Sequence, residues 1–217
     1  ADCRHLAEQI RAQLAHAFLV LREHESDSNE IRDMAARLQL LKGGLEALID
    51  KLAAQAIGAL RTRIHGDLHL GQILVSSGDV YLVDFEGEPA RTLEQRREKN
   101  SPWRDVAGLV RSYDYAAYFS ANSGPADMSE HAVQARQRLL ERYVPESRET
   151  FLRAYREAAP DHTAAEALLD LFTLEKATYE ICYEAANRPA WLIVPLRGLS
   201  ELAARLLSAT DNASSPQ

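Results

Sequence analysis

Three oxygen-bearing side chains, Asp67, Gln72 and Asp84, flank a short stretch with the pattern of a β-hairpin. Asp67 and Gln72 precede the first expected strand, and Asp84 follows the second. Phosphoryl transfer needs a carboxylate that accepts the proton of the attacking hydroxyl, together with oxygen ligands for Mg²⁺. Asp67 could be that base, while the Gln72 amide and the Asp84 carboxylate could bind the metal.

The spacing agrees with that of the catalytic segments of protein kinases. In those enzymes an Asn follows the catalytic Asp by five residues, and a later Asp-Phe-Gly brings a second carboxylate to the metal. Gln72 stands at the corresponding position after Asp67, and Asp84 is followed by Phe85. The combination favours a phosphotransferase.

Two other interpretations of this stretch are open. His65 and His69 could be ordinary histidines with Asp67 in a turn, because a lone His-Gly-Asp is a weak signal. Alternatively, His65, Asp67 and His69 would lie on one side of an extended segment and could hold a metal ion. The metal alternative does not explain why Phe85 follows Asp84.

The hairpin is the clearest strand signal in the chain. The run 73–75 and the run 80–85 are rich in β-branched and aromatic residues, and Ser76, Ser77, Gly78 and Asp79 between them are turn-forming residues. The hairpin would hold the two halves of the site at a fixed separation.

The first sixty residues have helical periodicity. One apolar stripe comprises Leu6, Ile10, Leu14, Phe18 and Leu21, and a second comprises Ile31, Met34, Leu38, Leu41, Leu45, Leu48 and Leu52. Asp27 and Glu30 have the spacing of a capping box at the start of the second helix. An antiparallel helix pair packed on the rest of the domain is favoured over self-association through a coiled-coil seam, because the pattern is short.

The region after the hairpin is again helical. We expect a charged loop and then helices over 105–119, 129–143, 146–158, 163–187 and 197–208, followed by a polar tail. The predicted fold class is mainly α with a small β-hairpin (α+β). The predicted organisation is a helical hairpin over 1–62, a catalytic-loop hairpin with a helical lobe over 63–208, and the tail over 209–217.

The late helix has two different faces. The mainly apolar face comprises Leu174, Ala177, Thr178, Ile181 and Ala185, and the opposite face comprises Lys176, Tyr179, Glu180, Tyr183 and Asn187. A solvated polar face is the usual interpretation of such a pattern. Two tyrosines among hydrogen-bonding groups also suit a sugar pocket.

Composition limits the class of partner. The net charge of −7 argues against a broad nucleic-acid surface, and no apolar run is long enough to span a membrane. Cys3 and Cys182 lack metal-type spacing and are expected to be inert thiols. These features favour a cytoplasmic protein that binds small molecules or other proteins.

Several strings together resemble bacterial maltokinases, which are related to aminoglycoside phosphotransferases and have a protein-kinase-like fold. The strings begin at His65-Gly66-Asp67 and continue with residues 83–89, 101–117 and 174–191. The resemblance as a whole covers about residues 63–196. The Asp-Phe-Glu-Gly-Glu-Pro string that begins at Asp84 is its most specific part.

The resemblance implies transfer of the ATP γ-phosphate to the anomeric hydroxyl of maltose, with Mg²⁺, in the route from trehalose to α-glucan, and trehalose synthase as a fused or bound partner. By the same resemblance Asp67 is the base, Gln72, Asp84 and Glu86 are metal ligands, and His65 and Asp105 support the catalytic loop. The substrate contacts it implies are His69, Lys176, Tyr179, Glu180 and Arg188. Trp191 is a weaker candidate, since a core tryptophan is the commoner case.

A working kinase also needs a glycine-rich loop and a strand lysine that clamp ATP. The four lysines, Lys42, Lys51, Lys99 and Lys176, lie outside any such strand, and Gly43-Gly44 falls within a predicted helix. We therefore expect an N-terminal ATP-clamping lobe to be missing, and the fragment alone to be inactive. A non-catalytic docking domain for a trehalose synthase, or a phosphotransferase with another acceptor, are the alternatives.

Overall fold

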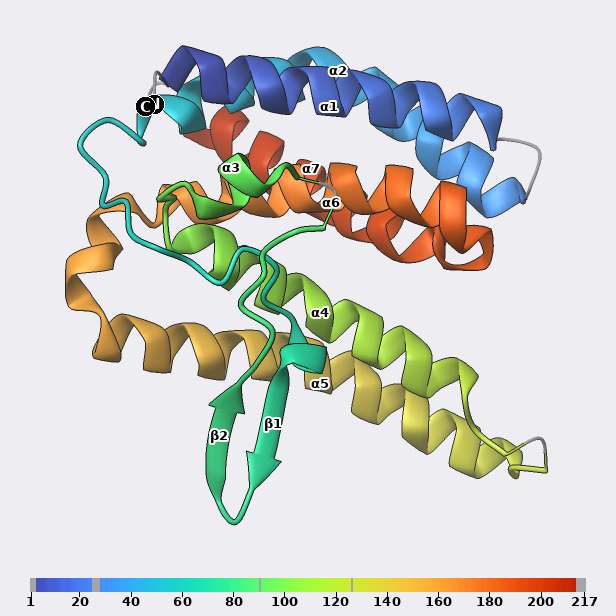
Figure 1. The fold of residues 1–217 in the computed structure, drawn as a ribbon. Coiled ribbons are helices and arrows are strands. Elements are labelled where there is room, and N and C mark those ends of the chain that lie inside the picture. The colour runs from blue at the N-terminus through green and yellow to red at the C-terminus, as the bar shows by residue number, and fades with distance from the viewer. Residues whose placement is uncertain (1–2, 25–27, 90, 126, 214–217) are drawn as a thin grey trace. The chain divides into compact units, whose positions relative to one another are not determined.

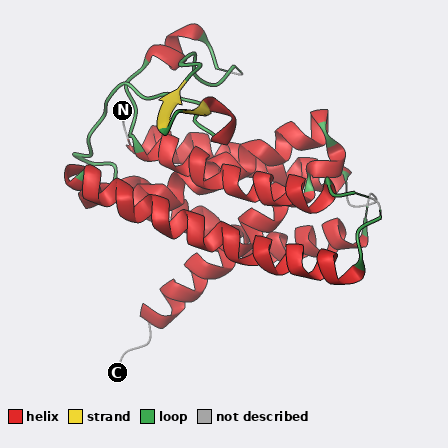
Figure 2. Cartoon of the chain, turned by 90° about the horizontal axis from the view of Figure 1, so that it is seen from below, coloured by secondary structure: helices red, strands yellow, loops and turns green. Residues whose placement is uncertain are grey.

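The structure is a computed structural model that describes residues 3–24, 28–89, 91–125 and 127–213 (Figure 1). Its elements in chain order are α1 (Cys3–Glu23), α2 (Asn29–Ala54), η1 (Leu70–Gln72), β1 (Ile73–Ser76), β2 (Asp79–Leu82), α3 (Leu93–Arg97), α4 (Trp103–Asn122), α5 (Glu130–Ala158), η2 (Pro160–Ala165), α6 (Ala167–Asn187), η3 (Pro189–Trp191) and α7 (Ile193–Ala213). Helices dominate, and a two-stranded sheet is present, which confirms the mainly α prediction (Figure 2).

The contacts divide the chain into two units. Unit 1 comprises residues 1–59 and 167–217, and unit 2 comprises Leu60–Glu166. This division differs from the predicted boundary after residue 62, because α6 and α7 group with the first two helices. The reason is that their apolar stripes complete a core that α1 and α2 cannot close alone.

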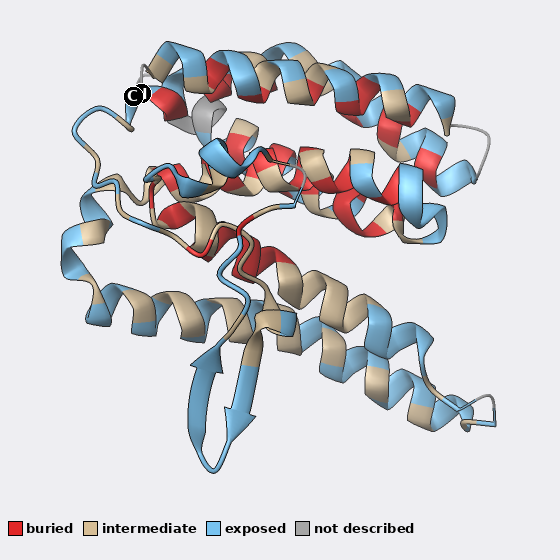
Figure 3. Ribbon diagram, in the orientation of Figure 1, coloured by how far each residue is buried: buried red, intermediate tan, exposed pale blue. Residues whose placement is uncertain are grey.

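Unit 1 is a group of four helices. Helix α1 packs on α2 and α6, and α7 packs on α2 and α6. Its fully buried side chains include Ile10, Leu14, Leu45, Ile49, Leu171, Leu174 and Ile181 (Figure 3). Most members of the two predicted N-terminal stripes are buried there, so these stripes form the core of unit 1 rather than a seam for self-association.

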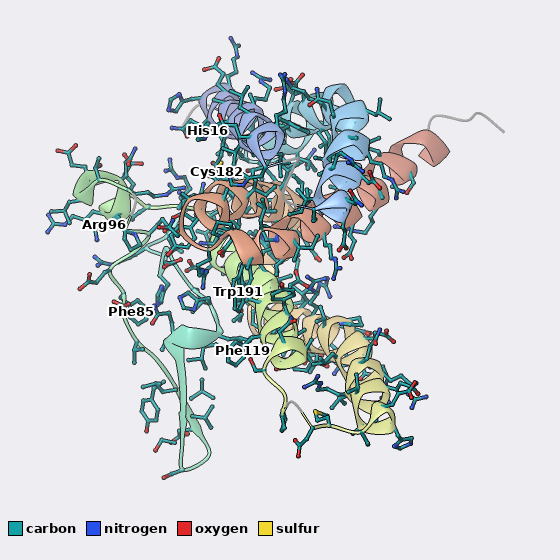
Figure 4. All side chains as sticks on the ribbon, turned by 90° about the vertical axis from the view of Figure 1, so that its right-hand side faces the viewer. His16, Phe85, Arg96, Phe119, Cys182 and Trp191 are labelled. Atoms are coloured by element: carbon teal, nitrogen blue, oxygen red, sulfur yellow. The ribbon has the colours of Figure 1, made fainter. Side chains whose placement is uncertain are left out.

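Asp27, the predicted start of the second helix, lies outside the described residues. The N-cap that the structure describes is Ser28, whose Oγ accepts a hydrogen bond from the Ile31 N–H at 3.0 Å. Cys182 lies beside His16 in this unit (Figure 4), with 3.5 Å between Sγ and Nδ1. Burial raises the pKa of the Cys182 thiol, which lowers its thiolate fraction and agrees with an unreactive cysteine.

Unit 2 contains the hairpin and the pair formed by α4 and α5. Strands β1 and β2 are antiparallel, with Ile73 opposite Leu82 and Ser76 opposite Asp79. Ser77 and Gly78 have φ of +53° and +85°, the paired positive values of a two-residue hairpin turn whose twist matches that of the strands.

Helix α4 begins on an aromatic cluster around the buried Trp103. Trp103 is 1% exposed, its indole N–H donates to the His162 carbonyl at 3.0 Å, and its ring meets Tyr155 edge-on at 5.2 Å between centroids. The Tyr155 hydroxyl is 2.6 Å from His162 Nδ1, which ties α5 to η2. This cluster fixes the first turn of α4, on which Asp105 lies.

Three helix predictions were wrong in detail. The break expected between 143 and 146 is absent, because α5 continues through Pro145; this residue is exposed, so water can replace the hydrogen bond that proline removes. The expected charged loop contains the short helix α3. Helix α7 begins at Ile193 and extends to Ala213, through part of the predicted tail, whereas residues 214–217 lie outside the described residues.

Within the described ranges, none of the helices combines the length and the hydropathy that a membrane span requires.

Candidate active site

The segment that carries Asp67 is held by a carboxylate of α4. Asp105 accepts hydrogen bonds from the backbone N–H of His65 at 2.6 Å, through Oδ2, and from that of Gly66 at 2.8 Å, through Oδ1. Burial raises the pKa of Asp105, although these two hydrogen bonds favour its ionised form. Both carboxylate oxygens of Asp105 therefore bind the loop backbone.

His65 links the same segment to the end of β2. Its Nε2 lies 2.8 Å from the Val83 carbonyl, and its Nδ1 lies 3.4 Å from the Asp67 N–H. A carbonyl can only accept, so Nε2 carries the proton and Nδ1 is left to accept from Asp67. The ring, 4% exposed, packs against Phe85 at 4.7 Å between centroids.

These contacts exclude the alternative metal site. Both nitrogens of His65 face backbone groups, and His69 Nδ1 accepts from the Gly71 N–H at 3.0 Å, which caps η1. Over the part of the chain that the structure describes, no three His, Cys, Asp or Glu side chains are grouped as a metal site requires. The proposal of a metal on His65, Asp67 and His69 is therefore wrong.

The loop before β1 touches the loop after β2, backbone against backbone. Gly66 and Gly87 have φ of +86° and +77°, and a Cβ on Gly66 would lie 3.0 Å from Gly87 Cα. Only glycine combines this backbone conformation with such a close approach. The contact brings the segment of Asp67 against the segment that begins at Asp84.

Gln72 and Asp84 meet at the base of the hairpin. The Gln72 Nε2 is 3.0 Å from Asp84 Oδ2, and the Val83 N–H donates to the Gln72 carbonyl at 3.1 Å. The pairing of Ile73 with Leu82 extends to these flanking residues, so the register of the sheet sets their proximity.

The donor set fits a magnesium ion that is shared with a nucleotide. Mg²⁺ commonly takes one or two protein oxygens and completes its octahedron with phosphates and water. Asp84 is exposed and supplies a carboxylate, and Gln72 would supply its amide oxygen by a rotation that exchanges the amide's oxygen and nitrogen. Glu86 is exposed on the same turn, where its N–H donates to the Asp84 carbonyl at 2.8 Å.

Asp84 has an unusual backbone. Its φ of +65° lies in the left-handed region, which costs a residue with a Cβ free energy. Strain of this kind gathers where a side chain has to be aimed at a particular point. The conformation places Asp84 at the turn between β2 and the Gly87 contact.

Two residues near this turn had no role in the sequence prediction. Gly87 makes the contact with Gly66, and Arg96 of α3 lies over Gly87 and donates from Nη1 to the Glu86 carbonyl at 3.3 Å. The sequence contained a signal for α3, because Thr92 and Gln95 form a reciprocal capping box.

The predicted acceptor residues lie on α6 in unit 1. Glu180 is only 7% exposed, so it is not on the solvated face that the helical pattern suggested. The Lys176 ammonium lies 5.1 Å from the centre of the Tyr179 ring, which stacks on Tyr183. This part of α6 therefore combines a buried carboxylate with a cation and stacked rings.

Arg188 is bound to a buried carboxylate. Its Nε and Nη2 donate to Glu184 at 2.9 and 2.6 Å, and Glu184 is 1% exposed. The guanidinium also lies 5.2 Å from the centre of the Trp191 ring. The contacts of Arg188 thus give it a structural partner, which the resemblance did not predict.

Comparison with known proteins identifies sugar kinases. No protein-family model matches the chain. It is 29% identical over 143 residues to a glucosamine kinase of Streptacidiphilus jiangxiensis and 29% identical over 141 residues to one of Mycolicibacterium smegmatis. These matches cover 64% of this chain and 31% and 33% of the two relatives.

Solved glucosamine kinases have a similar structure. One crystal form matches with a TM-score of 0.74 at 26% identity over 93% of this chain, and a complex with glucosamine, ADP and inorganic phosphate matches with a TM-score of 0.70 at 26% identity. The chain spans about half the length of these proteins, 46% and 45% respectively.

The relatives correct the family that the motifs suggested. Both the curated relatives and the solved structures are glucosamine kinases, so the identification as a maltokinase was wrong. Maltose as acceptor and trehalose synthase as partner rested on that identification and are withdrawn with it. What remains is similarity to sugar kinases whose solved complex contains ADP and an amino sugar.

Proposed function

We propose that this chain is part of an ATP- and Mg²⁺-dependent kinase that phosphorylates a hydroxyl of an amino sugar, with glucosamine as the first candidate acceptor. The observation that carries the proposal is the convergence at the base of the hairpin. There Gln72 and Asp84 are 3.0 Å apart, and the loop of Asp67 packs against the turn that follows Asp84. The similarity to glucosamine kinases supports the choice of acceptor.

In this proposal Asp67 is the general base. Its carboxylate takes the proton of the acceptor hydroxyl as that oxygen attacks the γ-phosphorus, and ADP leaves as the bond to the bridging oxygen breaks. His65 and Asp105 hold the backbone on which Asp67 stands.

Asp84 and Gln72 would hold Mg²⁺, with Glu86 as a further oxygen near by. The ion would supply charge neutralisation on the phosphates of the nucleotide. The residues of this chain contribute the position of the ion, because the hairpin register places the backbones of Gln72 and Asp84 side by side.

Acceptor recognition is assigned to α6. An amino sugar carries an ammonium group at neutral pH, and a carboxylate with little exposure is the natural partner for such a cation. Glu180 has that character, with Tyr179 and Lys176 beside it on the helix. His69 and Arg188 stay as candidate sugar contacts, although each has a backbone or side-chain partner within its own unit.

An acceptor panel on the complete natural protein tests the proposal. ADP formation should be fast with glucosamine and slow with N-acetylglucosamine, in which the amine is acylated, and with maltose. Glu180→Gln should raise KM for glucosamine by about tenfold or more and leave KM for ATP unchanged. Absence of turnover with every amino sugar, under conditions where the nucleotide binds, would overturn the proposal.

A further inference from the structure

Helix α4 presents a strip of three residues to the loop that contains Asp67. Asp105, Gly108 and Ser112 are spaced three and four residues apart, so they share one face of the helix. Each of them meets the loop backbone at a different point. Asp105 binds the N–H groups of His65 and Gly66, as described above.

Gly108 lets the loop approach the helix closely. A Cβ at this position would lie 2.6 Å from the carbonyl oxygen of Leu68, well inside the distance of any real contact. Glycine in a helix interior costs about 1 kcal/mol relative to alanine. The close approach of the Leu68 carbonyl is a physical reason for glycine at this buried position.

Ser112 forms the third anchor. Its Oγ accepts a hydrogen bond from the Leu70 N–H at 3.1 Å and donates one to the Leu109 carbonyl at 2.6 Å. Because the hydroxyl proton is directed to Leu109, a lone pair is aimed at Leu70. The hydroxyl thus connects the end of the loop to a fixed point on α4.

The anchors stand on both sides of Asp67. Residues 65 and 66 are fixed by Asp105, the Leu68 carbonyl rests on Gly108, and residue 70 is fixed by Ser112. A slip of the loop along α4 would break all three contacts together. The position of the Asp67 backbone is therefore defined by α4 before any ligand binds.

We propose that Gly108 and Ser112 are positioning residues, which set the register of residues 65–70 on α4 and thereby place the Asp67 carboxylate for proton transfer. The catalytic half of this inference rests on the proposed kinase function, whereas the anchoring half does not. Neither residue would touch a substrate.

Amide hydrogen exchange of the complete natural protein tests the anchoring. Ser112→Ala should speed exchange of the Leu70 amide by about tenfold, because its acceptor is removed, and Ser112→Thr, which retains a hydroxyl, should restore slow exchange. Ser200→Ala is the matched control: the Ser200 hydroxyl donates to the Leu196 carbonyl of its own helix in the same manner, at 2.8 Å. This control should leave the loop unchanged.

Steady-state kinetics of the complete natural protein test the catalytic half. Ser112→Ala and Gly108→Ala should lower kcat by about tenfold or more and leave KM for ATP nearly unchanged, since misplacement of a catalytic group acts on the chemical step. Ser112→Thr should recover most of kcat.

The outcomes separate the two claims. Unchanged exchange at Leu70 in Ser112→Ala overturns the anchoring. Faster exchange with unchanged kcat overturns the link to Asp67, while an active wild-type protein leaves the kinase function standing. An inactive wild-type protein overturns the kinase function and the catalytic half together, and the exchange result still decides the anchoring half.

Discussion

Replacing Asp105 by alanine should weaken the folding of unit 2 by an amount that its contacts define. The change leaves the N–H groups of His65 and Gly66 without their acceptor. A buried N–H that loses its partner costs about 1 to 3 kcal/mol, so the pair would cost about 2 to 6 kcal/mol. The substitution also removes a buried charge, and the raised pKa of Asp105 indicates that burying this charge opposes folding. We therefore expect a net loss of about 2 to 4 kcal/mol.

Urea unfolding followed by tryptophan fluorescence measures this loss. The chain has two tryptophans, and Trp103 is the one in unit 2, so the experiment is done in a Trp191→Phe background. Glu130→Ala is the matched control, because Glu130 is also an acidic residue in the first turn of a helix, but an exposed one. It should cost no more than about 1 kcal/mol. If Asp105→Ala costs no more than this control, the loop is not braced by Asp105 and the reasoning fails.

Three further predictions concern charge and backbone strain. Burial raises the folded-state pKa of Asp105, so the stability that this pKa shift contributes is complete below the ordinary carboxyl pKa and is lost as pH rises through the raised value. The unfolding free energy of the native chain relative to Asp105→Asn should therefore increase as pH falls from about 7 to about 4. A difference that does not change with pH would contradict this. Asp84→Gly should be at least as stable as the native chain, because glycine relieves the cost of the positive φ, a gain of up to about 1 kcal/mol, yet the complete protein should lose Mg²⁺-dependent nucleotide binding. A clear loss of stability in urea unfolding would refute the strain argument. Arg188→Ala leaves the buried Glu184 carboxylate without its bidentate partner, so it should lower the unfolding free energy of unit 1 by about 2 to 3 kcal/mol, which is more than Glu184→Gln should. Urea unfolding followed by circular dichroism measures both losses, and equal losses would show that leaving the Glu184 charge unpaired carries no extra cost.

The sequence predicted the elements that depend on local pattern. The hairpin was found because β-branched and aromatic residues flank Ser77 and Gly78, which adopt the positive φ values of a tight turn. The long helices were found from their apolar periodicity. The break expected between residues 143 and 146 was wrong: α5 continues through Pro145, whose exposure to water reduces the cost of the hydrogen bond that proline removes.

The site residues that could be predicted from the sequence are those whose side chains have a recognisable chemical role. Asp67, Gln72 and Asp84 stand out because phosphoryl transfer needs carboxylates and oxygen ligands at such spacings. Gly108 and Ser112 could not be found in this way. Their role depends on the backbone of a loop some forty residues earlier in the chain, and no periodicity or motif chemistry records that contact.

The family was predicted wrongly for a related reason, and the maltose acceptor that rested on it is not supported. The residues of the matching strings that could be given a chemical role either hold the loop, as Asp105 does, or are proposed to serve the phosphate end of the reaction, as Asp67 and Asp84 are. Kinases with different acceptors share these needs, so such strings do not identify the acceptor. In the proposed function acceptor choice resides in groups such as Glu180, whose burial becomes evident only when α6 is packed.

The most direct test of the account is the rate of ADP formation from ATP and glucosamine by the complete natural protein and its Asp67→Asn variant. The variant keeps the shape of the side chain and removes the base, so turnover should fall by about 10² to 10⁴-fold while the unfolding free energy and nucleotide affinity stay close to native. A variant that turns over glucosamine at a near-native rate would contradict the assignment of Asp67 and, with it, the proposed phosphotransferase site.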